Sequence, residues 1–197
     1  MAVSYSFHYS FFIFRLHFGK NLSILQSVDV PYTYSMKIIG IDPGFDRNGI
    51  AVIERSGTKD TLLYSCLIQT DKKQAMSERL ASVLIQFEQV LKEHHPDLLV
   101  MEQLFMSKNV TTVIGVAEAR GVILAACGRN SIPTKEIGPM QVKLALTGYG
   151  KADKSAVESM VSRLVTLPDR KIIDDEVDAI AIALAGSAMF GREFEKK

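Results

Sequence analysis

The order of strand-like and helix-like segments predicts an α/β fold, with a mixed five-stranded sheet flanked by helices. Three segments rich in β-branched and apolar residues follow one another at 37–42, 50–55 and 61–69, which is typical of a three-stranded antiparallel meander. Helix and strand patterns then alternate, which is typical of two parallel strands added to such a sheet. With 197 residues, of which 47% are hydrophobic, the chain can form one domain with a core.

The first strand carries a charged residue into a tight turn. Lys37–Ile41 is apolar after its first residue, and Asp42 follows it directly before Pro43 and Gly44. A carboxylate at the end of a buried strand costs free energy unless a partner compensates it. A metal ion is the usual compensation, so further carboxylates are expected to reach the same place.

Apolar periodicity places the remaining elements. Apolar residues from Leu80 to Leu91 repeat at i, i+3, i+4 and i+7, which predicts a helix that begins at Ser77 and buries one face. The strand at 97–101 also ends on a carboxylate, that of Glu102. The other expected elements are a helix over 109–127, a strand over 132–137, and helices over 139–146, 151–165 and 174–190.

Residues 1–35 differ from the rest of the chain. Five of the ten Phe residues lie within the first 18 positions, without a helical or strand period. The positive charges follow the apolar run, which is the reverse of the order in a signal peptide. An organelle transit peptide stays open, because no acidic residue precedes Asp29. We expect Met36 to be the natural start, 1–35 to be a dispensable, disordered extension, and 36–197 to form the domain.

Cysteine usage and charge suggest a cytoplasmic protein with a polyanionic partner. Cys66 and Cys127 lie far apart in apolar contexts, as reduced core residues do. No apolar run approaches the roughly 18 residues of a membrane span. The net charge is +1, but residues 104–170 hold 9 Lys and Arg against 5 Asp and Glu. A polyanion is therefore expected to contact this middle third of the chain.

Further carboxylates lie at the start of the last helix. Asp175 shares a helix face with Asp178, as does Asp174, because these pairs are spaced at i, i+3 and i, i+4. An ordinary acidic first turn, favoured by the helix dipole, is the simpler interpretation. The rest of this helix is almost wholly apolar, however, so its start must lie against the sheet, near Asp42 and Glu102. Oxygen ligands without histidine select Mg²⁺ or Mn²⁺, and such a set suits two ions that hydrolyse a phosphodiester with water as the nucleophile.

Five motifs in one register resemble the RuvC family of Holliday-junction resolvases, the crossover junction endodeoxyribonucleases. The resemblance extends from Met36 to about Ala188, so it covers nearly the whole chain except the extension. The motifs are Gly40-Ile41-Asp42-Pro43-Gly44, Met101-Glu102-Gln103-Leu104-Phe105-Met106, Ala117-Glu118-Ala119-Arg120-Gly121, Gln141-Val142-Lys143 and Asp175-Glu176-Val177-Asp178-Ala179.

The resemblance implies an RNase H-like fold and a Mg²⁺-dependent endonuclease. Such an enzyme resolves four-way DNA junctions in recombination and repair by paired symmetric nicks. The resemblance places the catalytic, metal-binding acids at Asp42, Glu102, Asp175 and Asp178, with two Mg²⁺ ions per subunit that Mn²⁺ can replace. Family members work as homodimers beside the branch-migration proteins RuvA and RuvB, which are therefore the expected partners.

The resemblance also implies DNA-binding residues. Lys143 and Lys154 would approach the scissile strand, and Phe105 would stack on an unpaired base at the crossover. Weaker candidates for phosphate contacts are Lys108, Arg120 and Lys151. In the competing interpretation, Phe105 is a core residue, and Lys151 and Lys154 lie on a solvated helix.

The symmetry of the reaction predicts a dimer. Two nicks related by a two-fold axis need two active sites, and one chain supplies one set of acids. The helix over 109–127 has more apolar residues than one buried face requires. It is therefore either the dimer interface or a central core helix.

Other functions compete with junction resolution. Actin-like and sugar-kinase-type ATPases also end their first strand with Asp-x-Gly, but they need further nucleotide-binding motifs and usually two domains. A non-catalytic junction-binding module would lack one of the acids, whereas all four are present. Other RNase H-like nucleases cut RNA–DNA hybrids or single strands, so a comparison of substrates is needed to distinguish these nucleases.

Overall fold

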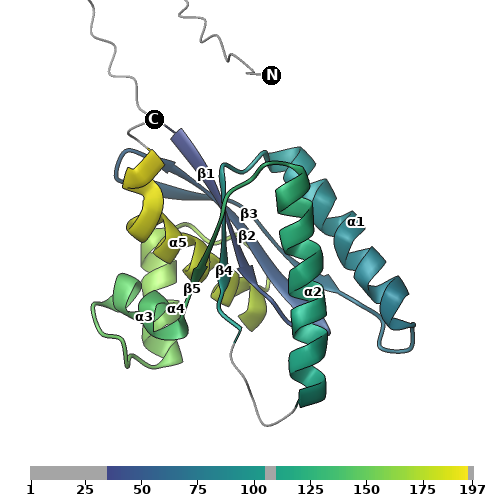
Figure 1. Cartoon of the computed structure of the whole chain (residues 1–197). Coiled ribbons are helices and arrows are strands. Elements are labelled where there is room, and N and C mark those ends of the chain that lie inside the picture. Colours follow the sequence, from purple (N-terminus) through teal and green to yellow (C-terminus); the bar gives the residue numbers. More distant parts are fainter. Residues whose placement is uncertain (1–34, 105–109, 195–197) are drawn as a thin grey trace, which may run out of the picture. The chain divides into compact units, whose positions relative to one another are not determined.

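The computed structural model describes residues 35–104 and 110–194, which form the sheet and helices of Figure 1. Residues 1–34, Phe105 and Lys108 lie outside the described residues, and with them nearly all of the expected extension. The strands are β1 (Ser35–Asp42), β2 (Arg47–Ser56), β3 (Lys59–Gln69), β4 (Leu98–Glu102) and β5 (Thr134–Ile137). The helices are α1 (Met76–His94), α2 (Val110–Arg129), α3 (Pro139–Thr147), α4 (Lys154–Leu164) and α5 (Asp174–Phe194).

The five strands form one mixed sheet in the order β3-β2-β1-β4-β5. β1, β2 and β3 make an antiparallel meander, while β4 is parallel to β1 and β5 is parallel to β4. The predicted α/β fold with a mixed five-stranded sheet is therefore confirmed. β1 begins at Ser35, which pairs with Ser56, so the sheet takes in one residue that was expected in the extension.

Alternate residues of the central strands face two separate cores. In β1, Ile38 belongs to the core beneath α3, α4 and α5, whereas Ile39 belongs to the core beneath α1 and α2. Leu98 and Leu99 of β4 divide in the same way, as the two-residue period of a strand requires. Figure 1 accordingly shows α1 and α2 on one side of the sheet and α3, α4 and α5 on the other.

Helix α5 packs directly on the backbone of β1. A Cβ at Gly40 would overlap the carbonyl oxygen of Ala179 and lie 2.6 Å from the backbone nitrogen of Ala183. At Gly49 of β2, a Cβ would overlap the backbone carbonyl of Asp175. The two glycines and the alanines of α5 therefore let the first turn of this helix lie against the ends of β1 and β2.

One helix begins later than predicted, and another packs in part as one of its two predicted alternatives requires. The expected helix over 151–165 begins only at Lys154, because Asp153 caps it by accepting a hydrogen bond from the Ala156 backbone nitrogen at 2.8 Å. Helix α2 buries Ile123 in the core through its C-terminal half, while Ile114 nearer its start is 54% exposed. It is thus partly a core helix. No helix in the described ranges is both long enough and apolar enough to span a membrane.

Candidate active site

Two neighbouring strands end on carboxylates at the same edge of the sheet. Ile41 of β1 pairs with Met101 of the parallel strand β4, so Asp42 and Glu102, one residue further along, lie next to each other in register. Both side chains are half-buried. Open α/β sheets bind ligands at this carboxyl edge, because strand ends and loops converge there.

The first turns of α5 bring further carboxylates to this edge. Because α5 lies on Gly40 and Gly49, Asp175 and Asp178 approach the end of β1. The charges of Glu102, Asp178 and Asp175 all act on Asp42. The structure therefore brings the four predicted acids into one electrostatic neighbourhood.

Burial and mutual repulsion oppose full ionisation of this group. Burial, followed by the negative charges of Glu102, Asp178 and Asp175, raises the pKa of Asp42 to about 7, against the smaller opposing effect of Lys154. Burial and the charge of Asp178 also raise the pKa of Glu102. A site whose carboxylates resist losing their protons has an excess of negative charge, and a bound cation would relieve it.

A cavity of about 240 Å³ opens between these acids and the α3–α4 region. Its charged lining consists of three acids, Asp42, Glu102 and Asp178, and two lysines, Lys143 and Lys154. Its apolar walls are Pro139, Val142, Val157, Ala181 and Ile182. The two lysines that the resemblance assigned to the scissile strand thus lie in the same cavity as three of the four acids.

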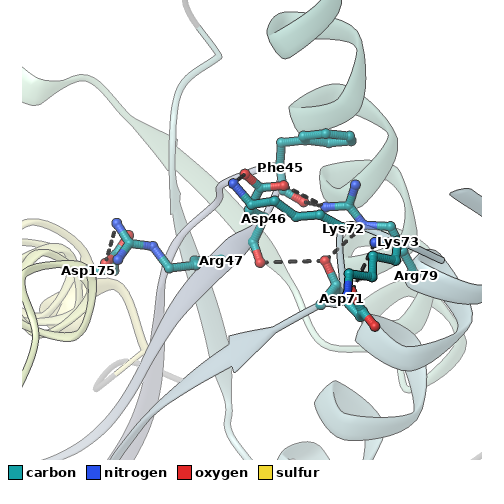
Figure 2. A network of polar contacts seen from close by, with 9 residues as sticks. Phe45, Asp46, Arg47, Asp71, Lys72, Lys73, Arg79 and Asp175 are labelled. Carbon is teal, nitrogen blue, oxygen red and sulfur yellow. Dashed lines mark hydrogen bonds and ion pairs between the residues drawn. The ribbon is translucent and has the colours of Figure 1, made fainter.

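Two cations hold the acids of the first turns of α5. The Nζ atom of Lys154 lies 3.2 Å from Asp178 Oδ2 and 3.3 Å from Asp174 Oδ2. Arg47, at the start of β2, lies 3.2 Å from Asp175 Oδ2 (Figure 2) and is not among the residues that line the cavity. The sequence motifs gave no indication of Arg47, because its partner lies far along the chain.

The donor set fits the chemistry of a hard divalent ion. All four predicted ligands are carboxylates, which is what Mg²⁺ and Mn²⁺ prefer. Among the described residues, however, no three acidic, histidine or cysteine side chains lie close enough together to form a ready ligand shell. At α5, Lys154 and Arg47 instead hold Asp178 and Asp175 in ion pairs.

A buried arginine braces the loop that follows Asp42. Arg79 of α1 donates hydrogen bonds to the Phe45 carbonyl oxygen at 2.9 Å, to Asp46 Oδ1 at 2.8 Å and to Thr70 Oγ1 at 3.0 Å. Its guanidinium also lies 4.1 Å from the centroid of the Phe45 ring, a cation–π contact (Figure 2). The loop is therefore fixed from outside the catalytic cavity.

The same loop is anchored to α2. A Cβ at Gly115 would overlap the ring of Phe45, so this helix lies directly on that ring. The hydrogen bonds of Arg79 were not predicted from the sequence, although one feature of the sequence indicated them. Arg79 stands four residues before Val83, and a charged residue on the buried face of a helix indicates a buried partner.

Arg120 was predicted to contact a phosphate, but the structure buries its side chain. The Arg120 side chain is 7% exposed, donates to the backbone carbonyl oxygen of Glu102, and pairs with Glu136 Oε1 at 2.6 Å. A guanidinium held in this way braces the ends of β4 and β5 and does not reach out to DNA. Lys151, by contrast, is exposed on the loop before α4, outside the lining of the catalytic cavity.

Comparison with known proteins gives one consistent match. The family model described as crossover junction endodeoxyribonuclease RuvC matches residues 38–186. The protein of that name from Thermosipho melanesiensis is 46% identical over 148 residues, 75% of this chain and 94% of that protein. The one from Carboxydothermus hydrogenoformans is 42% identical over 156 residues, 79% and 98% of the two chains.

Solved structures match the fold as well. T. thermophilus RuvC in complex with a Holliday junction substrate matches with a TM-score of 0.75 and 31% identity, covering 81% of this chain and 96% of that one. The yeast mitochondrial Holliday junction resolvase Ydc2, at 16% identity, has a TM-score of 0.57 over 86% and 89% of the chains. At that identity the second likeness shows a shared fold.

The RNase H-like sheet and its acidic edge define a hydrolytic nuclease. The chain belongs to the RuvC family of crossover junction endodeoxyribonucleases. Nucleases of this family depend on divalent metal ions, in agreement with the oxygen-only donors at the end of β1.

Proposed function

We propose that this chain resolves four-way DNA junctions by paired symmetric nicks, with one active site in each subunit of a homodimer. The observation that carries the proposal is the cavity in which Asp42, Glu102 and Asp178 meet Lys143 and Lys154. The acids are suited to holding metal ions and the lysines to neutralising a phosphodiester. RuvA and RuvB as partners, and a cytoplasmic location, are proposed from the family alone.

The acids have distinct places in the proposed mechanism. Asp42, flanked by Glu102 and acted on by both α5 acids, would be the central ligand, and Asp175 would join once Arg47 releases it. Two Mg²⁺ ions, which Mn²⁺ replaces, would lower the pKa of the attacking water and stabilise the leaving 3′ oxygen. Lys143 and Lys154 would orient the scissile phosphate and offset its charge. Phe105 and Lys108, outside the described residues, keep their proposed DNA contacts.

Three substrates test this function directly. In three parallel reactions that all contain Mg²⁺, the full chain is incubated with a synthetic four-way junction, a linear duplex or an RNA–DNA hybrid. We expect symmetric nicks in the junction alone. Equal cutting of all three substrates would contradict the proposal and favour another RNase H-like nuclease.

Exchange of Asp42 for asparagine separates binding from cleavage. Asp42→Asn keeps the size of the side chain but removes the charge that would hold the metal. We expect this variant to bind the junction in a gel-shift assay and to leave it uncut. Cleavage at the wild-type rate would show that Asp42 is not a metal ligand.

A further inference from the structure

A second hollow lies beside the catalytic cavity, and among the predicted site residues that the structure describes only Lys151 lines it. It is a groove of about 400 Å³ between α3 and the loop that follows it. Met140, Leu144 and Tyr149 line it and are 64%, 56% and 62% exposed. Gln141, Gly150 and Lys151 complete the lining. Large apolar side chains gathered on a surface in this way mark a binding site.

The groove is held in shape by its own loop. Gly148 ends α3 in the left-handed conformation, with φ of 75°. The hydroxyl of Thr147 donates to the Lys143 carbonyl oxygen at 2.7 Å and accepts from the Tyr149 backbone nitrogen at 3.1 Å. Tyr149 is therefore presented from a fixed backbone, so binding would cost little ordering of the loop.

Helix α3 contributes side chains to both the groove and the catalytic cavity. Pro139, Val142 and Lys143 line the cavity, while Met140 and Leu144 of the same helix line the groove. Lys151 stands at the groove, and none of the groove's lining residues is acidic. A strand that reaches from the cavity to the groove would therefore find an aromatic ring and an ammonium group there.

We propose that this groove holds a nucleoside of the DNA strand next to the scissile phosphate. Its base packs on Tyr149 and Leu144, and the adjoining phosphate lies at Lys151. An apolar platform beside a lysine is the combination that binds single-stranded nucleic acid, because bases stack while cations follow the backbone. The inference rests on the proposed function.

The test measures junction binding without cleavage. In the full chain carrying Asp42→Asn, Tyr149 is exchanged for alanine and, separately, for phenylalanine. Stacking of one base predicts a loss of affinity of about 5- to 150-fold for the alanine variant and almost none for the phenylalanine variant. Ile85→Ala on α1, where the side chain is 67% exposed, serves as the control and should bind normally.

A scan of the DNA tests the groove first without any change to Tyr149. Single abasic sites are placed along the strand on each side of the cleavage point, and binding to the Asp42→Asn protein is measured. One abasic position should weaken binding, and the same position should have no further effect with Tyr149→Ala. Unchanged affinity at every position would overturn the groove proposal, as would additive effects of the two changes.

The outcomes distinguish this inference from the function on which it rests. If the wild-type chain cuts no junction, the proposed function fails. If it cuts the junction while Tyr149→Ala binds and cuts like the wild type, the groove proposal alone fails. A changed sedimentation mass of Tyr149→Ala, with unchanged affinity for DNA, would show that a second copy occupies the groove.

Discussion

Lys154 connects two groups of the site, because its ammonium pairs with Asp178 and Asp174 while its side chain lines the catalytic cavity. At 50% exposure the ion pairs themselves add little stability. In the proposed mechanism, the side chain would exchange its carboxylate partners for a phosphate when the acids take up metal. We therefore propose that Lys154 serves catalysis and not folding.

Exchange of Lys154 for glutamine tests this assignment. The variant should cleave the junction about 10²- to 10³-fold more slowly, because charge on the phosphate is no longer offset in the transition state. Single-turnover cleavage gives the rate, and titration of the junction in Ca²⁺ gives the affinity. A loss of affinity together with a lower salt dependence, at a normal cleavage rate, would instead mark a ground-state phosphate contact. Lys92→Gln, exposed on α1, is the matched control.

The sequence could predict the residues whose place at the site follows from local spacing along the chain. Asp42, Glu102 and the i, i+3 pair Asp175 and Asp178 could be found because each ends a strand or begins a helix. The partners of Arg47, Arg79 and Arg120 could not be found, because each lies on another element and only folding brings it near. The charge of Arg120 predicted a phosphate contact, but its side chain is buried and pairs with Glu136.

At the scale of elements, the placement of α5 decides the geometry of the site. Local patterns predicted this helix and its buried alanines, but not the contact that orients it. That contact depends on Gly40, which in the sequence looks like an ordinary strand residue of low propensity. It also depends on Gly49, which the sequence placed in the turn before the strand at 50–55 but which lies within β2. The start of α4 was also misjudged, because the cap formed by Asp153 outweighs the helical pattern of the preceding residues.

Enlarging Gly40 should move α5 away from β1. In Gly40→Ala the added methyl group would overlap the Ala179 carbonyl, so the free energy of unfolding should fall by about 1–3 kcal/mol, as in other overpacked cores. Urea denaturation measures the change. Gly128→Ala on α2 is the control, because nothing lies within 4 Å of its added Cβ and alanine favours a helix. Equal stability of the two variants would show that α5 does not need Gly40.

Glu176 links the first turn of α5 to β3 through a hydrogen bond. Its carboxylate accepts from Ser65 Oγ at 2.9 Å and from Arg170 at 2.7 Å, and its side chain is 5% exposed. Burial alone would raise the pKa of Glu176, but the hydrogen bonds from Arg170 and Ser65 outweigh it and lower the pKa. A lowered pKa in the folded state means that the ionised form stabilises the fold.

The stability that Glu176 provides should therefore depend on pH. It is fully present above the unfolded value of 4.5 and is lost as the pH falls through the lower folded value. Glu176→Gln should lower the free energy of unfolding by about 1–3 kcal/mol at pH 7, less than for a fully buried pair because Arg170 is 44% exposed. The difference from the wild type should shrink in denaturation curves below pH 4.5. A constant difference down to pH 3 would contradict this account.

At the scale of the whole molecule, one chain carries one set of acids, and a junction has two strands to cut. A homodimer with independent active sites should therefore make two separate nicks. The exposed Ile114 in the N-terminal half of α2 keeps this helix as the candidate interface, while its C-terminal half serves the core.

Mixed dimers test the division of labour between subunits. Wild-type chain and tagged Asp42→Asn chain are co-expressed, and the heterodimer is purified through both tags. On a junction carried in a supercoiled plasmid it should produce nicked circles and few linear products, because one subunit cannot cut. Linear product at the wild-type rate would show that one active site cuts both strands.

Phe45 and Gly115 belong to different halves of the chain, yet they share one volume, because the ring occupies the space that a side chain at position 115 would fill. A bulkier residue at 115 requires a smaller one at 45, and the cation–π contact with Arg79 would disappear with the ring. Across the family, positions 45, 79 and 115 are thus expected to be inherited as a unit, and a natural exchange at one of them should carry exchanges at the others.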